Sequence, residues 1–395
     1  MNHPTIADIF RESFDAFLAS SEKQPKLHYR VVHAITSCRT AVLGGQKECC
    51  DHCGKQLVRY HSCRNRHCPR CQTTARMQWV SERLGECLPT GYFHVVFTIP
   101  SQLNPFALRN KKVFYNLMFR AVKETILELA ANEKHLGADM GFIGVLHTWG
   151  QTLMDHPHIH CIVPAGGYDS RHNRWKSVTG EFLFPIAVVR KLYRGKLMAF
   201  FTQALNAGDI QLHGELDHYR DEKLRRKLID HLYRTDWVVY IKQPFASTQA
   251  LVAYLGAYTH RVAISDSRIE HFENGRVTFS YKDYADNSRV KSMELDACEF
   301  IRRFLLHVLP QGYKRIRYFG FLAPRARAKR LERCRAFFKM PPREKKERKV
   351  RPWYETVKEL TGKDPLKCVA CGIGRLRCVA TLPRMPRSLA LLSGG

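Results

Sequence analysis

The chain has 395 residues, of which 45% are hydrophobic, so it can form two or three domains with a buried core. Lys and Arg number 64 against 36 Asp and Glu, which gives a formal net charge of +28 and favours a polyanionic partner, first of all nucleic acid. No apolar run approaches the ~20 residues of a membrane-spanning helix. The N-terminus lacks the pattern of a signal peptide, so we expect a cytoplasmic protein whose 14 cysteines are reduced.

The N-terminal part combines helices with a cysteine-rich segment. Apolar residues recur at helical intervals from Ile6 onward and predict helices up to about residue 45. Residues 46–75 then contain two Cys-x-x-Cys knuckles with a spacing close to that of four-cysteine zinc sites. Each knuckle presents two thiolates from one tight turn, so we predict a structural Zn²⁺ site. Its predicted ligands are Cys50, Cys53, Cys68 and Cys71.

Other ligands in this segment stay open. Five further residues could replace one of the four cysteines or build a second site: Cys49, Cys63, His52, His61 and His67. Arg64, Arg66 and Arg70 surround the second knuckle, which suits a module that contacts DNA phosphates. A zinc ion that only fastens this module to the next domain is an equally good interpretation.

Strands and helices alternate from about residue 90 onward. We expect strands at 93–100, 142–149, 237–241 and 278–281, and helices at 112–132, within 185–235 and at 248–258. The segment that begins at His156 is a further strand, which follows the strand 142–149 after a short turn. The short connection favours an antiparallel hairpin.

Two histidines in the second strand of this hairpin are candidate metal ligands. Side chains alternate along a strand, so His158 and His160 point to one face while Ile159 points into the core. Two imidazoles on one face can hold a single metal ion. A pair of surface or core histidines without a metal is the alternative.

A third ligand should come from the neighbouring strand. His147 can lie near His158 across the hairpin and is the favoured third ligand. His156 and Gln151 come next, and Asp155 at the turn is the weakest candidate. Three protein ligands leave positions for phosphate oxygens, so the expected cation is Mg²⁺ or Mn²⁺.

Tyr254 and Tyr258 are four residues apart in a predicted helix and therefore share one face. A phenol with a pKa near ~10 is a poor nucleophile unless a metal polarises the target phosphate and a base or cation lies nearby. The same spacing fits an aromatic stripe buried with Leu251 and Leu255.

The C-terminal part is strongly basic from Arg325 to Arg351. This segment is either a solvated arm or a DNA clamp that adds salt-dependent affinity. The tail then carries Cys368, Cys371 and Cys378, which would need a ligand from elsewhere to complete a zinc site.

An ordered set of motifs resembles the insertion sequence 91 family of bacterial transposases, over roughly residues 10–330. In chain order the motifs are Ser62–Pro69, His147–Gly150, His156–His160, Tyr254–Ser265 and Arg315–Leu322. The family belongs to the His-hydrophobic-His endonucleases, like replication initiators and conjugative relaxases.

The resemblance implies an α+β fold. A central antiparallel sheet with packed helices would form the nuclease core. An N-terminal helical and zinc-binding module would precede this core, and a basic C-terminal arm would follow it. We accordingly expect domains at 1–88, 89–325 and 326–395.

The resemblance also implies residue roles and a reaction. His158 and His160 would bind the catalytic cation, Tyr258 would be the nucleophile, and Tyr254 would be a second nucleophile. The enzyme would nick and rejoin single-stranded DNA at the ends of its mobile element, in rolling-circle transposition through a covalent 5′-phosphotyrosine link. Arg261 and Lys282 are either phosphate contacts or solvated residues.

The expected partners are the single-stranded ends of the mobile element, target DNA and the bacterial nucleoid. No Gly-x4-Gly-Lys-Ser/Thr loop is present, so a host helicase would supply unwinding. A plasmid replication initiator or relaxase with the same chemistry is one alternative. A zinc-dependent nucleic-acid-binding protein without catalysis is the other.

Overall fold

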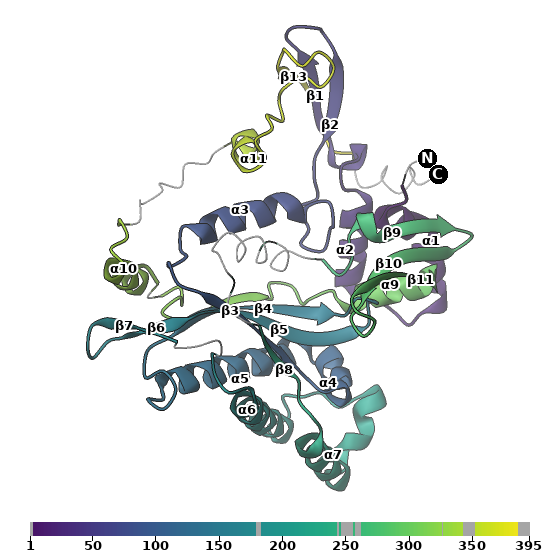
Figure 1. Ribbon diagram of the computed structural model, residues 1–395. Coiled ribbons are helices and arrows are strands. Elements are labelled where there is room, and N and C mark those ends of the chain that lie inside the picture. The colour runs from purple at the N-terminus through teal and green to yellow at the C-terminus, as the bar shows by residue number, and fades with distance from the viewer. Residues whose placement is uncertain are drawn as a thin grey trace.

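The computed structural model describes residues 3–178, 183–242, 245, 256, 262–325, 327–342 and 352–385 (Figure 1). Over these residues helices and antiparallel sheets combine into a mixed α/β protein, which confirms the predicted fold class. Among the described helices, none has the length and apolar character needed to cross a membrane.

A five-stranded antiparallel sheet forms the centre, in the order β12-β4-β5-β3-β8. Its strands are β3 (Tyr92–Thr98), β4 (Gly141–Trp149), β5 (Asp155–Pro164), β8 (Val239–Lys242) and β12 (Ile316–Gly320). β4 and β5 form the predicted hairpin, with His147 directly opposite His158. On the other side of β5, Val96 of β3 lies opposite His160. The pairing therefore places the histidine strand in the middle of the sheet.

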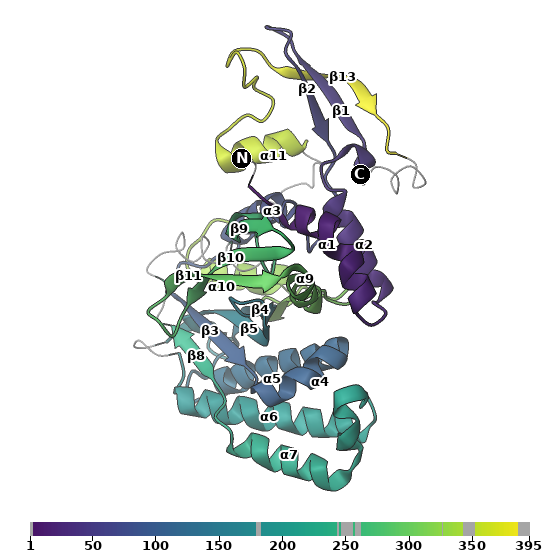
Figure 2. The same ribbon diagram turned by 90° about the vertical axis from the view of Figure 1, so that its right-hand side faces the viewer.

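Helices cover one face of this sheet (Figure 2). They are α4 (Asn104–Arg109), α5 (Lys111–Ala131), α6 (Ile186–Asn206) and α7 (Glu222–Arg234), with the short turns η2 (Ser101–Leu103) and η3 (Gly214–Arg220). Phe97 and Ile159 are fully buried in the core between these helices and the sheet. The ring of Phe97 packs edge-on against Tyr193 of α6, with 4.9 Å between ring centroids. Since side chains alternate along each strand, this apolar layer turns the neighbouring residues toward the opposite face.

The N-terminal helices share a second core with a later part of the chain. α1 (Ile6–Ser20) and α2 (Lys26–Thr36) pack with a three-stranded sheet and its following helix. These are β9 (Ile269–Glu273), β10 (Arg276–Asp283), β11 (Arg289–Asp296) and α9 (Ala297–Leu306), with the turn η4 (Asp266–Arg268) before them. Phe10 of α1 contacts Phe304 of α9 edge-on, with 5.2 Å between ring centroids. Residues of the predicted N-terminal module are thus packed into the region predicted as nuclease core.

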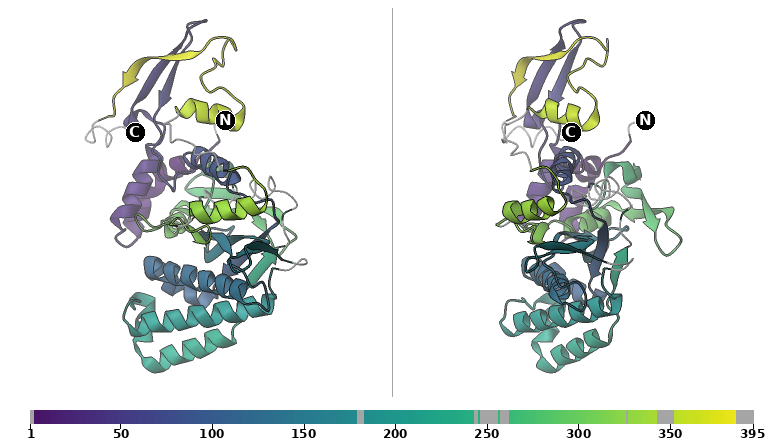
Figure 3. Two further views of the ribbon diagram at one scale, coloured as in Figure 1. Left: turned by 90° about the vertical axis from the view of Figure 1, so that its left-hand side faces the viewer. Right: turned by 60° about the vertical axis from the view of Figure 1, so that its left-hand side comes forward.

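A small sheet of order β13-β1-β2 projects from the rest of the molecule (Figure 3). It consists of β1 (Gly45–Cys50), which follows the turn η1 (Ala41–Leu43), β2 (Gln56–Tyr60) and β13 (Leu376–Leu382). β13 pairs with β1 so that Lys47 lies opposite Ala380. α11 (Trp353–Thr361) contributes Trp353, whose ring lies 5.0 Å from the guanidinium of Arg59 on β2. Over residues 352–385, the C-terminal segment is therefore folded onto the N-terminal module.

The face of the central sheet opposite α5 and α6 is crossed by α3 (Gln72–Leu84) (Figure 1). The indole nitrogen of Trp79 donates to the hydroxyl of Tyr318 on β12, 3.0 Å away. The remaining elements are β6 (Gly166–Asp169), β7 (Arg174–Ser177) and α10 (Arg327–Phe337). Trp175 of β7 packs with Leu331 of α10 at the edge of the core. α3 thus forms a roof over part of the face to which His158 and His160 point.

A substitution at Gly320, at the end of β12, tests how closely this strand packs against Met140. Its φ is 58°, and a Cβ atom there would overlap the carbonyl oxygen of Met140. We expect Gly320→Ala to destabilise the protein by roughly 3 kcal/mol, measured by thermal unfolding. Gly275→Ala is the matched control, because its φ is 70° but nothing lies within 4 Å of the added Cβ. Gly275→Ala should lower the stability by about 1 kcal/mol. An equal loss of stability in the two variants would contradict the close approach of β12 and Met140.

Candidate functional site

Three imidazoles converge on the sheet face that lies opposite α5 and α6. His147 comes from β4, and His158 and His160 come from β5, with their ligand nitrogens within 4.8 Å of one another. The ring centroid of His147 lies 5.4 Å from that of His158 and 4.5 Å from that of His160. The structure therefore brings the three predicted histidines together in one cluster.

Hydrogen bonds orient two of these rings. Nδ1 of His158 lies 2.6 Å from the carbonyl oxygen of His156, so Nδ1 donates and a metal ion would meet Nε2. Nδ1 of His160 lies 2.8 Å from Nε2 of His94, a buried histidine on β3. Burial lowers the pKa of His94 to about 3, with further lowering by Lys242 and His158, so this ring stays neutral. A neutral His94 can accept a hydrogen bond from Nδ1 of His160. A metal ion would then meet Nε2 of His160 as well.

His94 is a site residue that the sequence did not reveal. It lies in the strand expected at 93–100, on the same face as Val96 and Thr98. Alternation along this strand could therefore have predicted which face of the sheet His94 occupies. The pairing of β3 with β5 was not readable, because α5 and β4 separate these strands along the chain.

The other candidates for third ligand lie outside this group of three ligand atoms, although the ring centroid of His156 is 5.1 Å from that of His158. His156 is exposed, and the side-chain amide of Gln151 donates to the hydroxyl of Tyr284 at 3.1 Å. Asp155 interacts with Lys111 of α5, so its carboxyl group lies toward the helix-covered side. Of the four candidates that we considered, the structure groups His147 alone with His158 and His160, within the described residues.

Asp155 occupies an unusual environment for a carboxyl group. Both of its oxygens are buried and have no hydrogen-bond partner among the described residues. Burial raises the pKa of Asp155 to about 7, although the nearby Lys111 opposes this shift. Its ionised form is therefore disfavoured in the folded protein.

This raised pKa predicts a pH-dependent stability. The unfolded chain releases the Asp155 proton near pH ~4, whereas the folded protein keeps it up to about pH 7. Stability should therefore fall as the pH rises through this window. Asp155→Asn should raise the melting temperature at about pH 8, by an equivalent of roughly 2–4 kcal/mol, and change it little at about pH 4. Asp209→Asn, at an exposed position, is the control; a gain for Asp155→Asn that did not depend on pH would contradict this cause.

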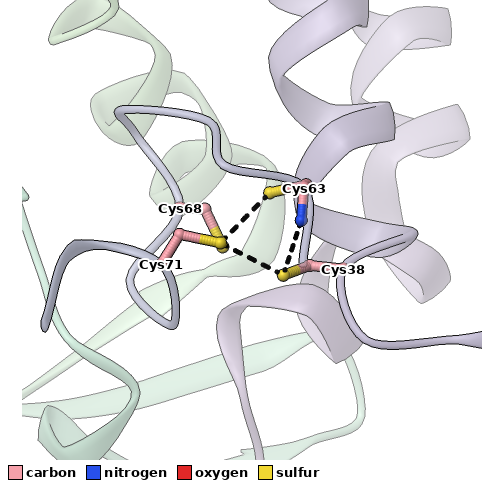
Figure 4. Close-up of side chains that lie close together, drawn as sticks. All are labelled: Cys38, Cys63, Cys68 and Cys71. Atoms are coloured by element: carbon pink, nitrogen blue, oxygen red, sulfur yellow. Dashed lines mark hydrogen bonds between the residues drawn. The ribbon is translucent and has the colours of Figure 1, made fainter. Parts of the chain in front are cut away.

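Four cysteines form a first sulfur cluster beside the N-terminal helices (Figure 4). They are Cys38, Cys63, Cys68 and Cys71. Sγ of Cys71 lies 3.4 Å from that of Cys38 and 3.5 Å from that of Cys63. Backbone amides donate to two of the sulfurs: that of Cys63 to Cys38, and that of Asn65 to Cys63. Four thiolates at such separations fit a tetrahedral Zn²⁺ ion.

A second sulfur cluster contains Cys50, Cys53, Cys368 and Cys371. The predicted grouping of Cys50, Cys53, Cys68 and Cys71 in one site is therefore corrected. The first knuckle lies at the tip of the β1–β2 hairpin, whereas the second immediately precedes α3. Hairpin formation thus separates the two knuckles. Cys63, which we had kept open as a ligand, and Cys38 complete the site of the second knuckle.

The predicted phosphate contacts of the zinc module differ in their surroundings. Arg64 is exposed, with a φ of 54°. The guanidinium of Arg66 donates to the carbonyl oxygen of Tyr313 at 2.8 Å, and that of Arg70 pairs with Asp266 at 3.3 Å. Arg66 and Arg70 therefore fasten the knuckle loop to the rest of the protein, while the side chain of Arg64 is exposed to solvent.

Tyr254, Tyr258 and Arg261 lie outside the described residues. Gly256, between the two tyrosines, is helical and buried, and a Cβ atom on it would lie 3.1 Å from Cγ2 of Val80 on α3. Gly256 itself therefore lies close to the helix that crosses the histidine face.

Lys282, the other candidate phosphate contact in the core, is exposed on β10. Its partner across the strands is Val290 of β11. This lysine is therefore accessible to a large anionic ligand.

Comparison with known proteins assigns the chain to a family. Residues 141–330 match a family model described as "Putative transposase", and residues 9–99 match one described as "Transposase zinc-binding domain". "Putative transposase y4qJ" of Sinorhizobium fredii is 43% identical over 374 residues, which are 94% of each chain. The chain belongs to the insertion sequence 91 family of transposases.

A second relative is less similar to this chain. The "Transposase for insertion sequence element IS801" of Pseudomonas savastanoi pv. phaseolicola is 28% identical over 353 residues, 88% of this chain and 82% of the relative. No solved structure matches the chain significantly. The first family match contains the histidine cluster, and the second contains the whole first sulfur cluster. The transposase acts on DNA and has a zinc-binding domain that includes these cysteines.

Proposed function

We propose that this transposase nicks and rejoins single-stranded DNA at the ends of its insertion sequence, by rolling-circle transposition through a covalent 5′-phosphotyrosine intermediate. The observation that carries the proposal is the cluster of His147, His158 and His160 on the central antiparallel sheet of a protein of this family. The single-stranded ends and target DNA are the proposed substrates, and host replication proteins would separate the strands.

The histidine cluster suits one catalytic divalent cation. Hydrogen bonds favour coordination through Nε2 in His158 and His160, and His147 adds a third imidazole from the neighbouring strand. We assign Mg²⁺ or Mn²⁺ to this site, and of the two Mn²⁺ accepts nitrogen ligands more readily. When bound, the cation would polarise the scissile phosphate.

Tyr258 is the proposed first nucleophile, and Tyr254 would act on the second DNA end. The tyrosine oxygen forms a bond to phosphorus while the bond from phosphorus to the 3′-oxygen breaks. The phenol loses its proton, and the departing 3′-oxygen gains one. One phosphodiester replaces another, so rejoining needs no external energy source. The position of Gly256 close to Val80 supports this assignment, because α3 lies on the histidine side of the sheet.

The zinc-binding domain would give the enzyme a rigid DNA contact. We assign structural Zn²⁺ to the first sulfur cluster, where Cys38, Cys63, Cys68 and Cys71 enclose the loop that carries Arg64. Exposed Arg64 and Lys282, together with Arg261, are the proposed phosphate contacts. The net charge of the chain is +28, so we expect it to bind DNA with an affinity that falls as the salt concentration rises.

A covalent-complex assay tests the proposal directly. The purified transposase is incubated with Mn²⁺ and a labelled single-stranded oligonucleotide from an element end, and the mixture is run on a denaturing gel. We expect a protein–DNA band that Tyr258→Phe abolishes and that Tyr233→Phe, an exposed tyrosine on α7, retains. Binding without a covalent band, for all cations and end sequences tested, would show a nucleic-acid-binding protein without this chemistry.

Cation binding tests the role of the histidines. His147→Ala should weaken Mn²⁺ binding strongly, and His94→Ala should weaken it about 10- to 100-fold because it removes the acceptor of His160 Nδ1. His94→Gln, whose amide oxygen can accept, should restore part of the affinity. Asp155→Asn is the control, since Asp155 lies on the other face of β5. Calorimetric titration measures all four variants, and an unchanged affinity in His147→Ala would refute the assigned ligand set.

A further inference from the structure

The second sulfur cluster unites opposite ends of the chain. Sγ of Cys50 lies 3.8 Å from that of Cys371, and Sγ of Cys53 lies 3.8 Å from that of Cys368. A tetrahedral Zn²⁺ ion with Zn–S bonds of about 2.3 Å separates its sulfurs by about 3.8 Å. Disulfide bonds would require about 2.05 Å. The spacing therefore matches a metal site rather than two disulfides.

Backbone amides around this cluster point to its sulfurs. The amides of His52 and Cys53 lie 3.4 and 3.5 Å from Sγ of Cys50. The amide of Gly374 lies 3.4 Å from Sγ of Cys371 in the other knuckle. Such donors stabilise thiolates, the form in which cysteine binds zinc. Backbone amides in both knuckles thus stabilise the thiolate form that binds a metal cation.

The two knuckles also fit closely against each other. A Cβ atom on Gly374 would lie 2.5 Å from Sγ of Cys50 and 2.6 Å from Cβ of His52, so only glycine allows this approach. Asp51 accepts from the backbone amide of Arg375 at 2.7 Å and from the guanidinium of Arg377 at 3.1 Å. Specific contacts therefore hold the C-terminal knuckle in register with the N-terminal one.

The surrounding sheet has little hydrophobic core of its own. Cys50, Cys368 and Leu376 are the buried members of the local apolar cluster, with Leu57 and Cys371 packed against them. Residues 377–381 of β13 are exposed. Small sheets with so few buried apolar side chains depend on a metal or another cross-link for stability.

We infer that the transposase binds a second structural Zn²⁺ ion through Cys50, Cys53, Cys368 and Cys371, and that this ion fastens the C-terminal segment to the β1–β2 hairpin. Neither family match contains Cys368 or Cys371, which lie beyond residue 330. The two metal sites are independent, because each has its own four sulfurs. The inference does not rest on the nuclease chemistry.

Zinc content per chain tests the inference. The full-length protein is purified without added metal, and its zinc is measured by mass spectrometry against the protein concentration. We expect two zinc ions per wild-type chain and one in the double variant Cys368→Ser/Cys371→Ser. Cys49→Ser/Cys378→Ser is the matched control and should keep both ions, because these cysteines lie in the same sheet but outside the cluster.

Cobalt substitution of the wild-type protein covers the case in which the serine variant does not fold. Two equivalents of Co²⁺ should each give the intense visible and thiolate-to-metal bands of tetrahedral four-sulfur coordination. Zinc removal should also make the C-terminal segment more sensitive to protease. One zinc or one four-sulfur cobalt site per wild-type chain, or two zinc ions in the folded Cys368→Ser/Cys371→Ser variant, would overturn the inference.

Discussion

The register of the β4–β5 hairpin is the constraint on which the histidine cluster depends. It sets His147 opposite His158 and leaves His160 one step farther along the same face. Ile159, between the two histidines, is fully buried on the other face. A slip of one residue would turn the imidazoles into the apolar core and Ile159 out of it, so hydrophobic burial and the grouping of the three histidines require the same register.

Because of this register, the two faces of the central sheet differ: one is apolar and covered by helices, and the other carries the histidines. One face buries Phe97, Ile159 and their neighbours beneath α5 and α6, and this apolar contact gives the sheet its rigidity. The other face carries the histidines, with α3 across part of it. A site on strands of a rigid sheet would lose little conformational entropy on binding the proposed cation and DNA strand. His94 adds to this order, since it fixes the ring of His160 from within the same sheet.

Much of the centre could be predicted from sequence, because it depends on local patterns. Alternation in a single strand identified His158 and His160, and a short turn predicted the hairpin that brings His147 to them. His94 was missed because its contact depends on the pairing of β3 with β5, which no local pattern specifies. Cys38 was missed for a similar reason: it is a lone cysteine at the end of a helix, and it becomes a ligand only where the chain returns at Cys63.

The division of the cysteines shows where sequence spacing fails. Two knuckles separated by a short segment are normally read as one zinc site, but here that segment contains β2, which pairs with β1 and holds the first knuckle away from the second. The ligands that it then lacks lie more than 300 residues later, at Cys368 and Cys371. Bringing these distant knuckles together costs conformational entropy, because a long loop must be closed. This entropic cost grows only slowly with loop length. The central sheet is stable through its apolar core, whereas the small projecting sheet has almost none. A metal bridge between the distant knuckles is therefore most valuable where hydrophobic burial is least, and this explains why the C-terminal segment returns to the N-terminal module.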